Sequence, residues 1–115
     1  MNIMKTITYH EKEYPVAFTL NVMQSIQEEY GTLDHWGELT DGAKGEPDAK
    51  AIIFAYTEMI NEGIDIYNND HPDSPKQFLT KKQVGRIITE VGLANATQML
   101  NQTVIESSQS AEKNA

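Results

Sequence analysis

The sequence predicts a mostly helical α+β domain, with an N-terminal β-hairpin, about four helices and a disordered C-terminal tail. Near the N-terminus, apolar residues alternate with polar ones, which is the period of a strand. From residue 22 onward they recur at helical spacing. With 115 residues the chain has the length of one domain, which we place at 1–106, followed by the tail at 107–115.

The hairpin is predicted for residues 5–18, KTITYHEKEYPVAF. In its first strand Ile7 and Tyr9 alternate with threonines, and the polar run 10–13 supplies the turn. Pro15 in the second strand cannot donate a ladder hydrogen bond, so it suits the edge of a sheet. Because a lone hairpin is only marginally stable in water, we expect its apolar side chains to pack on helices or to pair with another strand.

The first helix is predicted for residues 22–30. Asn21 and Gln24 fit a capping box at its start, and Gly31 provides a left-handed stop at its end. A short turn follows, with Thr32 as its cap, and a loop rich in glycine then leads to the next helix.

The chain's one tryptophan, Trp36, lies on this short turn among several carboxylates. Leu33, Trp36 and Leu39 are spaced three apart, so they share one side and face the body of the domain, while the acidic residues face water. We therefore predict that Trp36 is a core side chain rather than a platform for a ligand. Its indole N–H would lie near the edge of the core, where a partner could reach it.

The next helix is predicted from Pro47 to Gly63 and is expected to be the most buried one. The fixed φ of proline suits the first helical position. Gly63 fits the position just after a helix end, where Ile64 would fold back onto Met59. The polar segment 65–78, with two prolines, is predicted to be a connector.

Two amphipathic helices complete the domain. Thr80 caps the first, which ends at Gly92, and the second follows Leu93. The segment 107–115 holds only small, polar and charged residues, so burial cannot offset the entropy lost on ordering it. The two apolar stripes are Val84, Ile87, Ile88 and Val91 in the first helix, and Ala96, Met99, Leu100, Val104 and Ile105 in the second.

The composition limits the kinds of chemistry and compartment. The chain has no cysteine, which excludes disulfides, thiolate metal sites and cysteine nucleophiles. No apolar run approaches the ~20 residues of a membrane span and no signal peptide is recognisable, so we expect a cytosolic protein with no membrane partner. The net charge is −8, and most of the acids lie between residues 24 and 73. This acidic stretch is either a solvated face or a surface that selects a basic partner.

No catalytic, cofactor-binding or metal-binding residue is predicted, and we do not expect an enzyme. His10, His35 and His71 lie in predicted turns without the spacing of a metal motif. The segment 65–76 resembles a calcium loop only superficially, because it lacks the glycine and Lys76 stands where the bidentate glutamate belongs. The glycines form no phosphate-binding loop.

One family resemblance runs through the chain, on the segments MKTITYHEKEYPVAF, IQEEYG, LDHW, MINEGID and LTKKQVGRIITEVGL. The chain is similar to the tail assembly chaperones of long-tailed bacteriophages and prophages of Gram-positive bacteria. The resemblance covers about residues 4–108. Its motifs, such as Tyr30-Gly31 and Gly92-Leu93, are structural residues rather than catalytic groups.

The resemblance implies a non-enzymatic role. Such chaperones coat the tape measure protein in the host cytoplasm, keep its apolar stripes from aggregating, and help to recruit tail tube subunits around it. They leave before the tail is complete, so they are absent from the mature virion. The family often makes a longer, frameshifted product as well, and the tail 107–115 would suit the join to such an extension.

A chaperone for a long amphipathic helix needs an apolar groove with a charged rim, and it needs many copies, so we expect a homo-oligomer. The two C-terminal stripes could build such a groove or a subunit interface, or they could be core within one chain. The residues predicted to contact a partner are Trp36, Val84, Ile87, Ile88, Met99, Val104 and Ile105.

The alternative function is DNA binding, as a helix-turn-helix regulator of phage or prophage origin. Residues 83–102 could form that motif, with Gly92 in the turn and 94–102 as the reading helix. The reading helix has no lysine or arginine, although phosphate contacts normally supply most of the affinity. We therefore favour two ordinary amphipathic helices and expect no nucleic-acid partner.

Overall fold

The structure, a computed structural model, describes the backbone of residues 4–42 and 45–113 and the side chains of 5–42 and 45–106. It confirms the predicted fold class, because an antiparallel hairpin precedes a set of helices. The described residues form five helices rather than about four, since the short turn with Trp36 is a helix of its own. The elements are β1 (Met4–Tyr9), β2 (Lys12–Ala17), α1 (Leu20–Tyr30), α2 (Leu33–Thr40), α3 (Ala49–Asp70), α4 (Lys81–Val91) and α5 (Leu93–Lys113).

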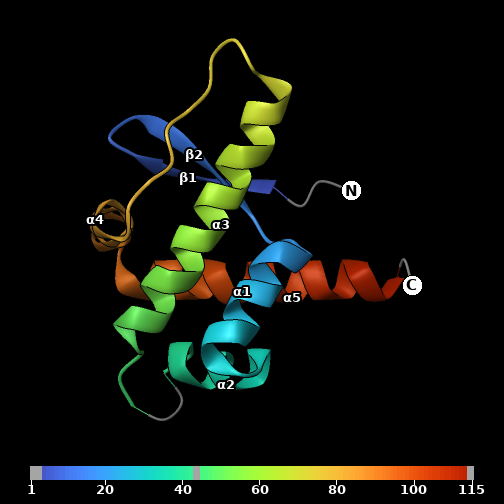
Figure 1. The fold of residues 1–115 in the computed structure, drawn as a ribbon. Coiled ribbons are helices and arrows are strands. Elements are labelled where there is room, and N and C mark those ends of the chain that lie inside the picture. The colour runs from blue at the N-terminus through green and yellow to red at the C-terminus, as the bar shows by residue number, and fades with distance from the viewer. Residues whose placement is uncertain (1–3, 43–44, 114–115) are drawn as a thin grey trace.

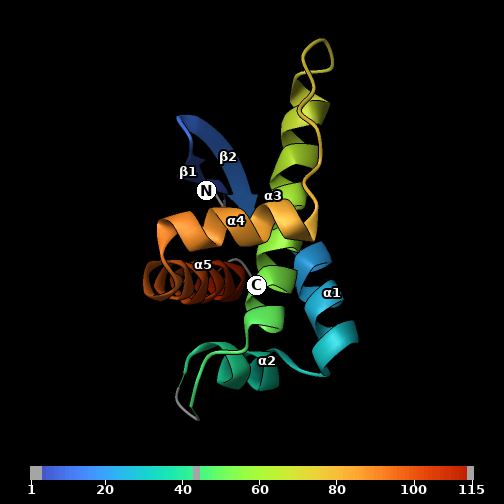
Figure 2. The same cartoon turned by 90° about the vertical axis from the view of Figure 1, so that its left-hand side faces the viewer.

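Helix α3 runs through the centre of the molecule, and the other elements pack around it (Figures 1 and 2). The hairpin lies against the C-terminal half of α3, where Gly63 meets Pro15, and α1 runs beside α3 from Glu62 to Phe54. α2 packs near the N-terminal end of α3. Helices α4 and α5 cross α3 in different directions: Figure 1 shows α4 end-on and α5 from the side, and Figure 2 shows the reverse. The result is a small domain in which one long helix contacts almost every other element.

The hairpin closes with a shorter turn than the predicted 10–13. His10 and Glu11 have positive φ values of 51° and 66°, and Tyr9 pairs directly with Lys12. A two-residue loop with two left-handed residues matches the right-handed twist of the flanking strands. Lys12 therefore begins β2, although its polarity is typical of a turn.

Gly63 lies in the middle of α3, so the predicted helix end there is wrong, and Ile64 makes no Schellman contact after it. A Cβ atom built on Gly63 would lie 2.7 Å from the carbonyl oxygen of Pro15, closer than real Cβ contacts occur. The glycine is therefore needed because β2 approaches α3 so closely. Since α3 continues past Gly63, the connector is 71–80 rather than 65–78.

Side-chain caps begin three of the helices. The hydroxyl of Thr32 caps α2, and the carboxylate of Asp48 caps α3 by accepting a hydrogen bond of 3.1 Å from the backbone N–H of Ala51. Thr80 forms a complete capping box with Gln83 at the start of α4. The predicted caps at residues 32 and 80 are confirmed, whereas α3 begins just after Asp48 instead of at Pro47.

Helix α1 begins differently from the prediction. Its N-cap residue is Thr19 rather than Asn21, and it makes no side-chain cap hydrogen bond. The Thr19 hydroxyl and the Asn21 amide, the latter at 3.0 Å, instead donate to the carboxylate of Glu62 in α3. A tertiary contact therefore uses the polar groups that the sequence assigns to a local cap.

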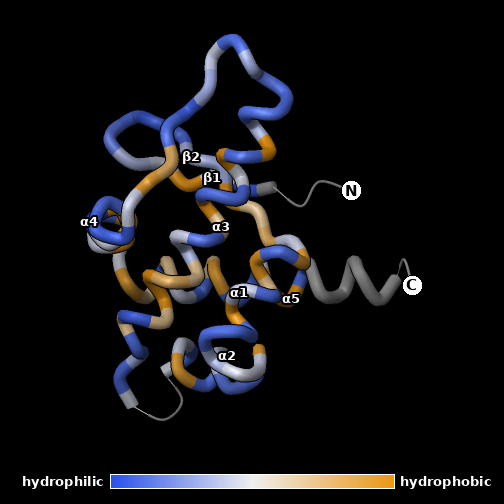
Figure 3. Tube along the Cα trace, in the orientation of Figure 1, coloured by the Kyte–Doolittle hydropathy of each residue, from blue (hydrophilic) through white to orange (hydrophobic). Residues whose placement is uncertain are grey.

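The core lies where α3 meets its neighbours. Helix α3 is deeply buried, as predicted. Figure 3 shows hydrophobic stretches toward the centre of the molecule and hydrophilic ones in the hairpin tip and the connector. The hydroxyls of buried threonines donate hydrogen bonds to backbone carbonyls of their own helices. For example, Thr57 donates to the carbonyl of Ile53 at 2.7 Å. The largest fully buried side chains include Trp36, Tyr56, Ile26, Ile52, Met59, Ile60, Ile64, Ile87 and Leu100.

The backbone of α5 remains helical through Lys113, so it enters the segment 107–115 for which the sequence predicts disorder. Alanine, glutamate, glutamine and lysine in this segment are good helix formers, which favours continuation of the helix. Residues 114–115 lie outside the described part of the chain. The disordered tail therefore stays a prediction.

Candidate protein-binding surface

Trp36 is a core side chain, as the spacing of α2 predicts, and it is 1% exposed. Its indole Nε1 donates a hydrogen bond of 3.2 Å to the backbone carbonyl of Ala51 in α3. Leu33 and Leu39 pack against the core beside it, while Asp34 is exposed. The N–H that was expected near a partner is therefore occupied within the chain.

The other predicted contact residues divide between core and surface. The three on α4 are buried, whereas of those on α5 two are partly buried and one is exposed. Only one of the six is open enough for a partner to contact most of its side chain. They are Val84, Ile87 and Ile88, at most 5% exposed, Met99 and Val104, which are half-buried, and Ile105, which is 55% exposed.

A groove that the sequence did not predict lies at the junction of α4 and α5. It consists of two hollows of about 340 and 410 Å³ that meet at Leu93, and we call it the Leu93 groove. Leu93 is 47% exposed, although it is a large apolar residue. The first hollow is lined by Ala49, Ile52, Ile53, Gly85, Ile88, Thr89 and Leu93, and the second by Asp41, Pro47, Leu93, Ala94, Thr97, Gln98 and Asn101.

The turn between the helices places Leu93 at this surface. Gly92 ends α4 with a φ of 97°, and α5 begins at the next residue, so no loop covers the junction. Gly85 keeps the first hollow open, because it has no side chain over Ile53, whose Cδ1 would lie 3.6 Å from an added Cβ. Small residues therefore leave an apolar depression between α3 and α4 that Leu93 borders.

Tyr56 fixes α5 against α3 next to the groove. Its hydroxyl donates a hydrogen bond of 2.6 Å to the backbone carbonyl of Ala96. Burial raises the pKa of Tyr56 far above its usual range, so the hydroxyl stays protonated and remains a donor. The helices that supply most of the groove lining are therefore held together beneath it, whereas its lining residues Asp41 and Pro47 lie in the segment between α2 and α3.

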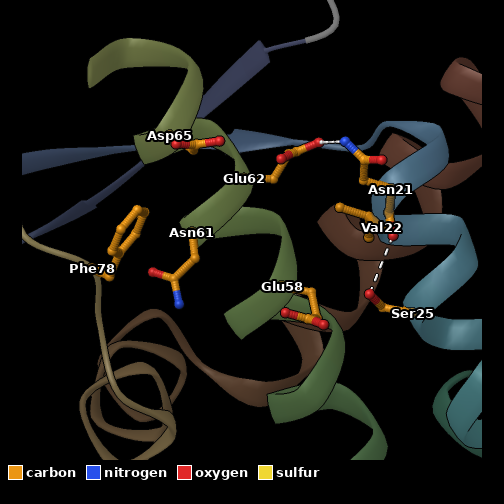
Figure 4. Close-up of a pocket in the computed structure, with 8 residues that line it drawn as sticks. All are labelled: Asn21, Val22, Ser25, Glu58, Asn61, Glu62, Asp65 and Phe78. Atoms are coloured by element: carbon orange, nitrogen blue, oxygen red, sulfur yellow. Dashed lines mark hydrogen bonds between the residues drawn. The ribbon is translucent and has the colours of Figure 1, made fainter. Parts of the chain in front are cut away.

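A second, acidic hollow of about 330 Å³ lies between α1 and α3 (Figure 4). Carboxylates of Glu58, Glu62 and Asp65 line it from α3, and the ring of Phe78 from the connector stands on the side away from α1. Phe78 is 56% exposed. Asn61 holds the connector in place, because its amide donates to the carbonyl of Leu79 and accepts from its N–H. Carboxylates beside an aromatic face suit a cationic side chain.

Tyr30 is a structural residue near the junction of α1 and α3. Its ring packs edge-on against Phe54, with centroids 5.7 Å apart. Burial raises the pKa of Tyr30, and the carboxylates of Asp48 and Glu29 raise it further. Its hydroxyl is buried and has no hydrogen-bond partner within the described residues. It lines none of the three hollows described above.

Metal-ligating side chains do not gather anywhere in the described part of the chain. No group of three or more histidines and carboxylates there could hold a metal ion. The three histidines are exposed, and two stack on tyrosine neighbours: His10 on Tyr9 and His71 on Tyr67, with centroids 3.9 and 4.0 Å apart. These rings are surface groups of the hairpin tip and of the end of α3.

Sequence reasoning noted Leu93 only as the residue after a helix stop and did not single out Phe78. Both carried a usable signal: Leu93 is a large apolar residue between Gly92 and Ala94 at a turn, and Phe78 is an aromatic residue beside Leu79 in an otherwise polar connector. Comparisons of the chain with models of known protein families, with curated proteins and with solved structures find no match.

Proposed function

We propose that this protein is a non-enzymatic assembly chaperone of a phage or prophage, which binds the tape measure protein and helps to recruit tail tube subunits. It acts in the cytoplasm of the host cell and is absent from the finished virion. The client is a long amphipathic helix, and several copies of the chaperone cover it. The sequence resemblance supplies the identity of the client, and the surface chemistry supports a role in binding helices.

The observation that carries the proposal is the Leu93 groove. Amphipathic helices bind their partners by laying an apolar stripe into a preformed apolar groove. The two hollows give such a stripe two adjoining places, with Leu93 between them at 47% exposure. Fully burying an exposed leucine side chain is worth about 1.5–3 kcal/mol, so covering the exposed 47% of Leu93 would contribute about half of that to binding.

The acidic hollow adds charge selectivity to the same proposal. With a net charge of −8, the chain attracts basic segments and repels acidic ones. Glu58, Glu62 and Asp65 offer carboxylates to lysine or arginine side chains on the polar flank of a client, and Phe78 offers a ring face. An apolar groove and a separate acidic hollow are together suited to a basic amphipathic helix.

The test is co-expression with the tape measure protein of the same phage or prophage, comparing the wild-type chain with Leu93→Asp. Aspartate suits the first residue of a helix, so the variant should fold. We expect the amount of soluble tape measure protein that copurifies to fall at least about tenfold, which corresponds to about 1.4 kcal/mol. Circular dichroism confirms that the variant is folded.

Leu20→Asp is a matched control. Leu20 is also the first residue of its helix and is more exposed, at 77%, but it does not line the Leu93 groove. It should leave copurification unchanged. If Leu93→Asp retains the client as well as the wild type does, the groove is not the client site. If the wild type shifts duplex DNA at physiological salt, the helix-turn-helix alternative replaces the proposal.

Within the described residues no helix combines the length and apolar character needed to cross a membrane. The encoding DNA offers an independent check on the proposed role. A slippery heptamer near the stop codon, followed by a very long gene with coiled-coil patterning, would support it. A neighbouring operator or an integration module without tail genes would count against it.

A further inference from the structure

The two edges of the hairpin are not equivalent. The sheet of the described residues contains only β1 and β2, so each strand has one edge without a strand neighbour. The edge of β2 is covered by α3, where Gly63 meets the carbonyl of Pro15. It also contains a proline, which protects an edge because it lacks an N–H donor. β1 contacts α4, and its Lys5 pairs with Glu106 of α5, but it contains no proline, and Thr6 and Thr8 on it are exposed.

The direction of the Pro15 carbonyl shows which groups of β1 point outward. Because this carbonyl faces α3, it does not face β1, so the pair of Thr6 and Pro15 exchanges no hydrogen bonds. The N–H and C=O of Thr6 must therefore point away from β2. Since the pattern alternates along the strand, the same holds for Met4 and Thr8. The pairing of Tyr9 with Lys12 across a two-residue turn fits this alternation.

These outward groups have no partner among the described residues. No backbone hydrogen bond outside the hairpin involves a residue of β1. Thr6 and Thr8 are exposed, so water satisfies their backbone groups in the isolated chain. An uncovered edge with free donors and acceptors is a template for another strand.

We propose that β1 is the pairing edge of a symmetric dimer, in which the hairpins of two copies join as one continuous antiparallel sheet. In the register we propose, Thr6 faces Thr6 of the second copy, and Met4 faces its Thr8. Each of these pairs has outward-pointing groups, so each exchanges two hydrogen bonds. The proposal does not depend on which client the protein binds.

The charge of the chain favours a second copy at this edge. Two chains of net charge −8 repel each other, which favours contact through a surface that is poor in acids. The strand β1, MKTITY, has no acid, and its single charge, Lys5, is paired with Glu106 at 2.9 Å. In the proposed register Lys5 faces Ile7 of the second copy, so no like charges oppose each other. Threonine pairs across strands are also favourable.

Single cysteines test the proposal cleanly, because the natural chain contains none. Paired Cα atoms in a hydrogen-bonded antiparallel pair are about 5.5 Å apart, which suits a disulfide. We expect Thr6→Cys to form a disulfide-linked dimer rapidly under mild oxidation. Thr8→Cys is the matched control: it lies about 13 Å from its own copy in this register and should link slowly, but rapidly when mixed with Met4→Cys.

The mass in solution gives an independent readout. The wild type should have twice the 12.9 kDa mass of one chain in sedimentation at micromolar concentration. Thr6→Pro removes an outward N–H that the hairpin does not use, so it should give a folded monomer. A monomeric wild type, or equal cross-linking of Thr6→Cys and an exposed Thr89→Cys on α4, would overturn the proposal. Loss of client binding with the dimer intact would instead reject only the proposed function.

Discussion

Helices α4 and α5 have similar apolar stripes in the sequence, but the fold covers them unequally. On α4, the stripe residues Ile87 and Ile88 are 2% and 5% exposed. On α5, Leu100 is fully buried, whereas Leu93 and Ile105 near the two ends of the described side chains are 47% and 55% exposed. The α4 stripe is thus core except for the partly buried Val91 at its end, whereas the α5 stripe is core only in its middle.

The cause is the position of each helix. α4 lies between α3, β1 and α5, so it has neighbours along most of its apolar face. α5 packs mainly on α4, and its main tether to α3 is the hydrogen bond from Tyr56 to Ala96. Apolar spacing therefore shows which residues share a face of a helix, whereas the number of neighbours determines how much of that face is covered.

The largest expected effect comes from truncating matched isoleucines on the two helices. Ile87→Ala should lower the free energy of unfolding by about 2–5 kcal/mol, because it leaves a cavity among fully packed neighbours. Ile105→Ala should change it by less than about 0.5 kcal/mol. Urea denaturation followed by circular dichroism measures both. Equal costs would mean that something covers Ile105 in solution.

Matched glycines test the spacing between α3 and its neighbours. Gly63→Ala places a Cβ 2.7 Å from the Pro15 carbonyl oxygen, so it should destabilise the protein by about 2 kcal/mol through overpacking. Gly85→Ala on α4 meets only Ile53, at an ordinary 3.6 Å, and should stabilise its helix by up to about 1 kcal/mol. Chemical denaturation of both variants gives the sign. Stabilisation by Gly63→Ala would show that β2 can withdraw from α3.

Local features of this fold were predictable from the sequence. Thr32 and Thr80 cap helices because the cap hydrogen bond spans only three residues, and Gly92 ends α4 because its φ is positive. Gly63 was misread because a helix stop and a close approach both require glycine, and the deciding neighbour, Pro15, lies far away in the sequence. A distant contact also explains why Asn21 does not cap α1: its side chain donates a hydrogen bond to Glu62 in α3 instead.

The candidate site was harder to predict than the fold. The α4 stripe was offered as partner surface or core, and the structure buries it. The Leu93 groove depends on how α3, α4 and α5 cross, which no local pattern encodes. A large apolar residue directly after the helix-ending Gly92 was the one available signal. Function at this surface stays a proposal that the Leu93→Asp experiment tests.

Removing the tether of α5 should have a moderate effect. Tyr56→Phe deletes the buried hydrogen bond to Ala96 and should cost about 1 kcal/mol in the free energy of unfolding. Tyr67→Phe is the control, because the Tyr67 hydroxyl makes no hydrogen bond within the described residues. Hydrogen exchange of α5 amides should increase in Tyr56→Phe alone. Unchanged exchange would mean that α4 suffices to hold α5.

The same residue gives a pH dependence with a defined sign. The pKa of Tyr56 is raised in the folded state above its ordinary value of 10.0, so folding favours the protonated form. Its contribution to stability is fully present below pH 10 and is lost as the pH rises beyond it. The wild type should therefore lose more stability than Tyr56→Phe between pH 9 and 11, as read from thermal melts. Parallel losses would show that Tyr56 ionises freely in the folded protein.

The smallest effect is expected at the ion pair of Lys5 with Glu106, where the exposed half of α5 meets β1. The hydrogen bond from Lys5 lowers the pKa of Glu106, and one from Gln102 lowers it further. A lowered pKa stabilises the folded state above the unfolded pKa, and this contribution disappears as the pH falls through the folded pKa. Because this pair lies at the surface, with the Glu106 side chain 48% exposed, solvent screens it, and Glu106→Gln should scarcely change the melting temperature at pH 7 and not at all in acid. A substantial loss at pH 7 would mean that this end of α5 is held as firmly as α4, and the contrast between the two helices would then fail.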